Sequence, residues 1–303
     1  MTLETSTAAT TGEWADTHKP IVVAVDGSER NRSAVAWASA EAAAAGCKIV
    51  LITAVEDHLV PTPHFSIRSQ KHQVRDMLAD AWHEVRHIIS EDDVTTEVVA
   101  GSPVEVLLDR SADARMVVVG KRGLGGLARL IVGSTSIAIA GRAKVPVAIV
   151  PDAWKQEDHK TLPVVIGIDP YRGDHNAIHL AFNRARRLGV RLVAVHGWEP
   201  SAAYSWDPAA MAGAITQMEQ EAHAEFDKVL GVWRERFGDV EVEAVHSHSH
   251  PAMALLDAAE QAQFVVLGRQ TDGKLGGFAF GSVTRAVLHY SKCPVMVVPS
   301  EAS

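Results

Sequence analysis

The sequence predicts an α/β protein of two tandem doubly wound domains, each a five-stranded parallel sheet flanked by helices. Three observations support this fold class. Short Val- and Ile-rich runs alternate with stretches of helical periodicity, as in a parallel sheet covered on both faces. The alternation occurs twice along the chain. A glycine-rich segment follows a predicted strand at the same place in both copies.

The elements of the first copy follow from hydrophobic periodicity. Val74, Leu78, Ala81, Val85 and Ile88 keep a spacing of three and four residues, which predicts one buried face on the second helix. The predicted strands are residues 21–26, 48–55, 94–100, 116–120 and 145–150. The predicted helices are residues 31–45, 68–90, 103–112 and 134–143.

The second copy keeps the landmarks of the first. From Asp26 to Asp169 is 143 residues, whereas from Gly120 to Gly268 and from Gly133 to Gly281 is 148. The five extra residues fall between the second strand and the third helix of the second copy. Repeats of this length indicate duplicated domains. The predicted divisions are a disordered tail at 1–18, a first domain at 19–152, a linker at 153–162 and a second domain at 163–300.

Composition limits the function classes. The 303 residues are 47% hydrophobic, enough for two cores, and the net charge of −8 argues against a nucleic-acid partner. No apolar run approaches the roughly 20 residues that span a bilayer, so no membrane partner is expected. Cys47 and Cys293 form no CxxC pair, and the N-terminal residues do not resemble a secretory signal. A reducing, cytoplasmic location is therefore expected.

The glycine pattern of the first copy predicts a phosphate site. Gly120-Lys121-Arg122-Gly123 follows an apolar strand, and Gly133-Ser134 opens a helix. Backbone N–H groups at a glycine loop and a helix N-terminus together favour an anion. Asp26 ends a neighbouring strand, so the aspartate and the loop can meet at the carboxyl edge of the sheet. The simpler alternatives are a tight turn at the glycines and helix N-caps at Asp26, Ser28 and Ser134.

These residues resemble the universal stress protein family in its tandem form. Its nucleotide-binding members carry Gly-x2-Gly-x9-Gly-(Ser/Thr), which Gly120, Gly123, Gly133 and Ser134 match. The resemblance implies a flavodoxin-like or adenine nucleotide alpha hydrolase-like fold. It also implies ATP, alone or with Mg²⁺, as the ligand of a regulatory stress-response protein with slow or no hydrolysis. The protein is accordingly expected not to be an enzyme, and no catalytic residue or metal ligand is assigned.

The resemblance also implies the binding residues. Those of the first copy lie at strand ends, in the glycine loop and at the following helix: Ala24, Asp26, Ala54, Val119, Gly120, Lys121, Arg122, Gly123, Gly125, Gly126, Gly133, Ser134 and Thr135. Those of the second copy are Gly167, Asp169, Gly197, Leu267, Gly268, Arg269, Gly281, Ser282 and Val283. Gly197 is expected to leave room for adenine. Thr271 replaces the second motif glycine and Asp272 follows it, so occupancy of the second site stays open.

Two further segments suggest partners or ligands. The apolar closing strands, 145–150 and 293–298, resemble the strand that pairs domains in the family, which implies pairing within the chain and a homodimer. His246, His248 and His250 alternate on a predicted strand. They are interpreted as a polar strand end near the cleft rather than a metal site, because no cysteine or carboxylate completes a ligand set.

Two other functions remain as alternatives. One is a slow ATPase or an enzyme acting at the α-phosphate, with Lys121, Lys274 or the histidines as the candidate groups. No Walker-type loop or Gly-x-Ser-x-Gly elbow supports it. The other is an interaction scaffold with empty pockets.

Overall fold

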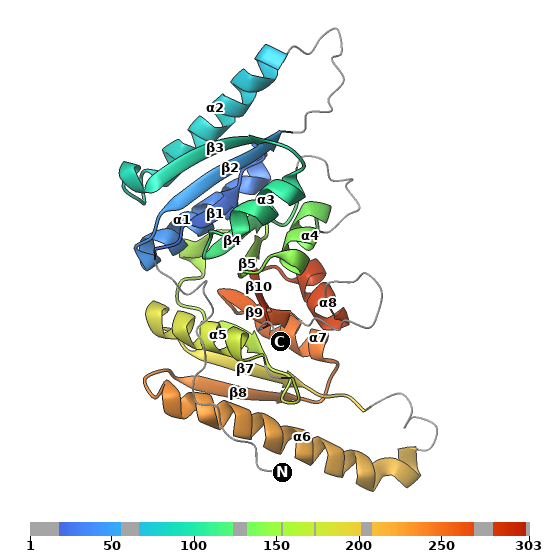
Figure 1. Cartoon of the computed structure of the whole chain (residues 1–303). Coiled ribbons are helices and arrows are strands. Elements are labelled where there is room, and N and C mark those ends of the chain that lie inside the picture. Colours follow the sequence, from blue (N-terminus) through green and yellow to red (C-terminus); the bar gives the residue numbers. More distant parts are fainter. Residues whose placement is uncertain are drawn as a thin grey trace.

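The strands form one continuous sheet in the computed structural model. The structure describes residues 18–55, 67–123, 132–152, 154–172, 174–200, 208–269 and 281–300. In the helix at 67–85 side chains are described from residue 74 onward, and in the helix at 208–236 from residue 213 onward. The sheet has ten strands in the order β3-β2-β1-β4-β5-β10-β9-β6-β7-β8. Figure 1 shows the first copy above the second, with α2 and α6 at the two far ends.

Each copy contributes five strands that are parallel to one another, as predicted. In the first copy they are β1 (Ile21–Ala24), β2 (Ile49–Val55), β3 (Val94–Ala100), β4 (Met116–Gly120) and β5 (Val147–Val150). The helices between them are α1 (Arg32–Ala45), α2 (Ile67–Val85), α3 (Pro103–Ser111) and α4 (Ser134–Arg142).

The second copy repeats this order. Its strands are β6 (Val164–Gly167), β7 (Leu192–Gly197), β8 (Val242–Ser247), β9 (Phe264–Arg269) and β10 (Val295–Pro299). Its helices are α5 (His175–Leu188), α6 (Pro208–Arg236), α7 (Pro251–Ala259) and α8 (Ser282–Tyr290). The five extra residues of the second copy fall in the predicted interval, between its second strand and its third helix. The helix in this interval, α6, has 29 residues, whereas α2, its counterpart in the first copy, has 19.

The end of α2 differs from the prediction. The helix stops at Val85, and the amides of Ile88 and Ile89 both donate to the Val85 carbonyl, which tightens the chain into a turn. Ile88 is 47% exposed, whereas Ile89 is 9% exposed. The predicted buried position at Ile88 is therefore wrong, because the turn moves the apolar contact one residue along the chain.

The two copies meet where β5 and β10 pair in antiparallel fashion. Ala148 lies opposite Met296, which is its equivalent 148 residues later, and the flanking pairs are Val147 with Val297 and Ile149 with Val295. A register in which equivalent residues face each other requires an approximate twofold axis through the seam. This antiparallel pairing also covers an edge strand of each copy, β5 in the first and β10 in the second.

Two apolar layers cover the sheet. Alternate strand residues point to opposite faces. Ile21 and Val23 belong to the layer that contains α1, α2, α5 and α6, whereas Val22 belongs to the layer that contains α3, α4, α7 and α8. Trp37 of α1 contacts Phe264 of β9 edge to face, with ring centroids 6.2 Å apart, so one core layer continues across the seam. Across the described residues, no helix is long and apolar enough to cross a membrane. The predicted tail at 1–18 lies almost wholly outside the described residues.

Candidate functional site

The predicted site of the first copy lies at the carboxyl ends of β1 and β4. The strand β1 has β2 on one side and β4 on the other, so successive connections leave it toward opposite edges of the sheet. A switch in strand order of this kind leaves a crevice beyond the strand ends, where doubly wound sheets bind ligands. Asp26 follows β1 and Gly120 ends β4. Both parts of the predicted site therefore reach the switch point.

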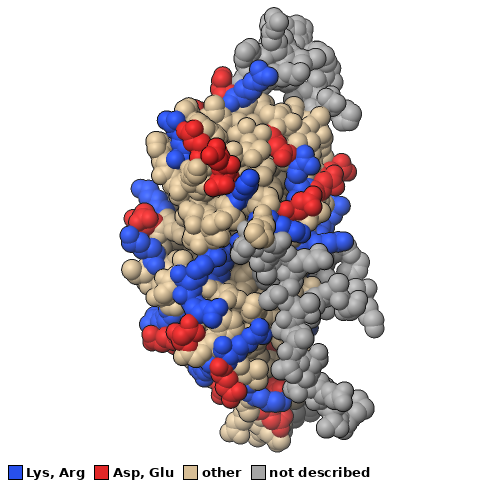
Figure 2. Space-filling model, turned by 60° about the vertical axis from the view of Figure 1, so that its left-hand side comes forward, with Lys and Arg blue, Asp and Glu red and all other residues tan. Residues whose placement is uncertain are grey.

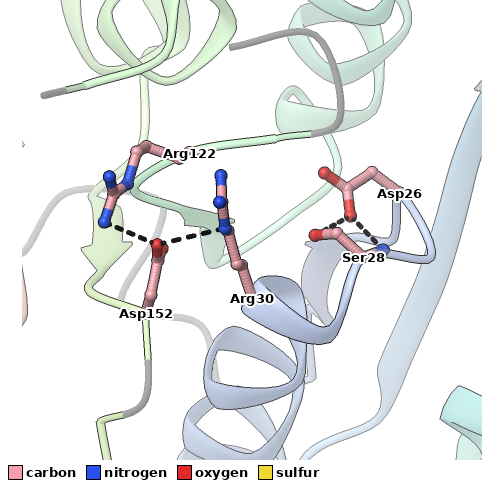
Figure 3. A network of polar contacts seen from close by, with 5 residues as sticks. All are labelled: Asp26, Ser28, Arg30, Arg122 and Asp152. Carbon is pink, nitrogen blue, oxygen red and sulfur yellow. Dashed lines mark hydrogen bonds and ion pairs between the residues drawn. The ribbon is translucent and has the colours of Figure 1, made fainter. Parts of the chain in front are cut away.

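Asp26 faces the start of the glycine loop. Its Oδ1 accepts hydrogen bonds from the Ser28 amide at 2.9 Å and the Ser28 hydroxyl at 2.8 Å (Figure 3). Gly27 allows this tight turn because its φ is +75°. A Cβ atom on Gly123 would lie 2.8 Å from Asp26 Oδ2, so a larger residue there would displace the carboxylate. Asp26 is thus not a helix cap, and its second oxygen is directed at the loop.

The loop is closed at its base and leads into α4. The Gly133 amide donates to the Lys121 carbonyl at 2.8 Å, and Ser136 Oγ donates to the Gly120 carbonyl at 2.7 Å. Gly133 is the N-cap of α4 and forms no side-chain cap, so the alternative of Ser134 as N-cap is wrong. Ser134 and Thr135 open the first turn, where main-chain amides attract anions. Gly125 and Gly126 lie outside the described residues.

Arg122 and Arg30 share one carboxylate beside this loop. Arg122 Nη2 lies 2.8 Å from Asp152 Oδ2, and Arg30 Nε lies 3.8 Å from the same oxygen (Figure 3). Asp152 Oδ1 and Arg122 Nε are buried with no hydrogen-bond partner in the described part of the chain. The cluster therefore carries one excess positive charge and an unused donor. Sequence reasoning missed Arg30 and Asp152; the position of Asp152 just after the strand beside β4 was the available signal.

The remaining predicted residues of the first copy have different surroundings. Val119 is 2% exposed and packs in the core, so only its main chain can line a pocket. Ala54 is partly buried at the end of β2. The Ala24 carbonyl accepts a hydrogen bond from Asn31 Nδ2 at 3.0 Å. Asn31 itself is buried beside Gly120, a position that the motif did not reveal.

Lys121 and Arg269 point across the seam rather than into their loops. Lys121 Nζ donates to the Ser291 carbonyl at 2.8 Å, and burial, followed by the nearby charge of Arg122, lowers its pKa to about 8. Arg269, its equivalent, donates to the Ala143 carbonyl at 2.5 Å. Ala143 and Ser291 are themselves equivalent residues, at the ends of α4 and α8. The Lys121 ammonium group is therefore engaged at the seam, and its main chain is the part that remains at the glycine loop.

The second copy carries a carboxylate over its motif glycine. A Cβ atom on Gly268 would lie 2.4 Å from the Asp174 side chain, and Asp174 stands where the first copy has Asn31. Burial, followed by the charge of Asp169, raises the pKa of Asp174. Asp169 is engaged by Arg172 at 3.2 Å and by the Tyr171 amide at 3.1 Å. Two acidic groups therefore lie where the first copy has one acid and one amide.

The other predicted residues of the second copy are closely packed. A Cβ atom on Gly197 would lie 2.6 Å from the Pro251 backbone, so the start of α7 packs directly against this glycine. Gly167 packs beneath Leu255 and Leu267, and Leu267 is 4% exposed. Gly281 caps α8, and Ser282 and Val283 open it, as in the first copy. Thr271, Asp272 and Lys274 lie outside the described residues.

The alternating histidines contact α6 and α7. His246 Nε2 lies 3.2 Å from Asp227, and His248 Nδ1 lies 2.8 Å from Glu219, both on α6. His250 Nδ1 accepts the Ala252 amide at 3.2 Å and caps α7. Among the described residues, no group of three or more His, Cys, Asp or Glu side chains is arranged to hold a metal ion.

Comparisons with known proteins agree with this architecture. The family model described as the universal stress protein family matches residues 17–151 and again 161–299. Universal stress protein Rv2005c of Mycobacterium tuberculosis is 33% identical over 287 residues, covering 91% of this chain and 96% of that protein. A universal stress protein of Mycolicibacterium smegmatis is 33% identical over 291 residues, covering 92% and 96%.

A solved structure extends the likeness to the whole fold. The crystal structure of a universal stress protein from Archaeoglobus fulgidus aligns with a TM-score of 0.67 at 18% identity, covering 92% of this chain and 98% of that chain. At this identity the likeness concerns the fold alone. The two family matches and the relatives over most of the chain lead to one conclusion: the protein belongs to the universal stress protein family and carries two copies of its domain in tandem.

Proposed function

We propose that the first copy binds an adenine nucleotide, ATP alone or with Mg²⁺, and that the protein acts as a regulatory nucleotide binder in a stress response. The observation that carries this proposal is the position of Asp26 Oδ2 against Gly123, at the mouth of a loop that ends in α4. Family membership supports it, because the chain carries the glycine motif of the nucleotide-binding members.

The chemistry of the pocket suits a nucleoside phosphate. Asp26 has one oxygen held by Ser28 and one free to accept a ribose hydroxyl. The first turn of α4 supplies amides for phosphate oxygens. Arg122 and Arg30 share Asp152, so their joint charge favours an anion at the loop. Each group is placed by a strand end or a helix start, which orients it before the ligand arrives.

The second copy is proposed to bind a nucleotide more weakly, giving one tightly bound nucleotide per chain. Asp174 beside Gly268 places a carboxylate next to the space for phosphate, and like charges repel. Gly197 is covered by the start of α7. In the first copy, the neutral Asn31 stands at the position of Asp174, and the partly buried Ala54 stands at the position of Gly197.

Binding rather than turnover is proposed for this site. Within the described residues, the nearest lysine to the loop, Lys121, is held by the Ser291 carbonyl. Asp26 is held by Ser28 and faces the loop entrance at Gly123. Hydrolysis is therefore expected to be slow or absent. A steady-state phosphate-release assay tests this point, and turnover well above about one per minute would favour an enzyme instead.

Isothermal titration calorimetry tests the binding site itself. Gly123→Glu should abolish ATP binding to the first copy, because its side chain would collide with Asp26 and add a negative charge. Gly213→Glu is the matched control: it adds the same charge at an exposed position of α6 where a Cβ atom meets nothing within 4 Å. Equal ATP affinity in the two variants would remove the site assignment.

A further inference from the structure

A second cavity lies at the opposite end of β4, between the two copies. Its volume is about 380 Å³. Arg115 and Met116, at the amino end of β4, line one side, and the α5 segment from His179 to Arg187 lines the other. Arg115 directly precedes the five-residue strand β4, which ends at Gly120, so the cavity is on the order of 15 Å from the glycine loop. It is therefore a separate compartment from the nucleotide site.

The wall of this cavity carries four guanidinium groups. They belong to Arg115, Arg184, Arg186 and Arg187. Figure 2, which brings this side of the molecule forward, shows Lys and Arg side chains gathered at mid-height, at the level of the seam. A concentration of cations is unusual here, because the whole chain has a net charge of −8. The charge of the cavity is thus local rather than a property of the protein as a whole.

One carboxylate serves two of these arginines. Glu41 of α1, 1% exposed, pairs with Arg184 and lies 3.3 Å from Arg187. Arg184 is 5% exposed, and burial, followed by the charge of Arg187, lowers its pKa well below the ordinary value. Glu41 supplies one negative charge for two guanidinium groups, so the three side chains together carry one net positive charge. Arg184 is buried against Glu41, whereas Arg187 is exposed and directs its charge toward the cavity mouth.

The other two arginines add to this excess. Arg115 Nη1 is buried with no hydrogen-bond partner in the described part of the chain. Arg186 donates to the neutral oxygen of Asn183 at 3.0 Å, so its charge has no acid opposite it in that contact. His179 contributes a further ring nitrogen to the wall. The cavity therefore has about three positive charges in excess and an unused N–H donor.

We propose that this interdomain cavity binds a small polyvalent oxyanion of the phosphate class. Guanidinium groups form paired, charge-assisted hydrogen bonds with phosphate oxygens, and the unpartnered Arg115 donor would gain an acceptor. A cavity of this volume, open on one side to solvent, suits a small molecule. Both copies line the cavity, so the ligand would bridge them. The proposal does not depend on nucleotide binding at the glycine loop.

Titration with inorganic pyrophosphate at fixed ionic strength tests the proposal. Calorimetry on the full chain should show binding in the wild type and in Gly123→Glu, since that substitution affects only the nucleotide loop. Arg115→Ala should weaken the affinity about tenfold or more, as expected for the loss of a charge-assisted hydrogen bond. Arg75→Ala, at an exposed position of α2, removes the same charge elsewhere and should leave the affinity unchanged.

A second variant keeps the test decisive if Arg115→Ala does not fold. Arg186→Ala removes a different guanidinium from the same wall, and circular dichroism establishes that each variant is folded. Pyrophosphate binding that is lost in Gly123→Glu but retained in Arg115→Ala would place the anion at the glycine loop and overturn the proposal. Equal affinities of Arg115→Ala and Arg75→Ala, or no binding by the wild type at millimolar pyrophosphate, would also overturn it.

Discussion

Lys121 offers a test of how the two copies are held together. Its ammonium group donates to the Ser291 carbonyl across the seam, and the residue is 9% exposed. Burial lowers its pKa from 10.5 to about 8. The folded protein therefore loses this proton at a lower pH than the unfolded chain does. Between about pH 8 and 10.5 the unfolded state holds more protons, so the contribution of Lys121 to stability rises with pH.

The magnitude follows from the two pKa values. The difference between 10.5 and about 8 corresponds to about 3 kcal/mol over the whole titration. Between pH 7.5 and pH 9.5 only part of the transition is crossed, which amounts to about 2 kcal/mol. Lys121→Met removes the titrating group. The wild type should therefore gain about 2 kcal/mol in unfolding free energy relative to Lys121→Met across this interval.

Guanidinium chloride unfolding of both proteins at both pH values measures this difference. Cys293, whose pKa burial raises to about 11, is present in both proteins, so the part of its contribution that is due to burial cancels. A relative change below about 0.5 kcal/mol would refute the reasoning, because it would mean that Lys121 titrates as an exposed lysine.

Three further predictions follow from the site and the seam. Asp26→Ala should weaken ATP binding about tenfold or more, measured by calorimetry, and unchanged affinity would contradict the ribose contact. Asp174→Asn should raise stability at neutral pH, because burial raises the pKa of this acid and its ionised form opposes folding. That gain should vanish as pH falls toward 3.8, and a gain that is constant with pH in thermal unfolding would argue against it. Glu41→Gln should cost about 3–5 kcal/mol in denaturant unfolding by leaving Arg184 without its counter-charge, and Glu41→Met combined with Arg184→Met should recover most of that loss. A cost below about 1 kcal/mol would show that the pair is not buried as described.

Glu41 and Arg184 also illustrate a consequence of domain duplication. They are equivalent residues, 143 positions apart, in helices that meet beside the seam. In a dimer of identical chains an acid at this position would face the same acid. A fused pair can place opposite charges there, which favours pairing within one chain over exchange between chains.

Local features made much of the fold predictable. Strand and helix periodicity, the constant offsets and the glycine motif each depend on residues close in sequence, so the α/β class, the order of the elements and the meeting of Asp26 with the glycine loop could be inferred. The insertion in the second copy was located because α6 replaces α2 without changing the order of strands. The end of α2 was misplaced because helical periodicity does not reveal where a turn tightens.

The sequence by itself determined the family, the duplication and the position of the glycine loop, because these are properties of short segments and of their spacing. Only the tertiary structure decided which groups the charged side chains contact. Lys121 was expected in its own loop but contacts Ser291, which is 170 residues away, and Asp174 covers Gly268 across a strand–helix packing that no motif describes. The physical reason is that a side chain's partner depends on which segments the fold brings together, and one buried carboxylate or carbonyl is enough to redirect a cation.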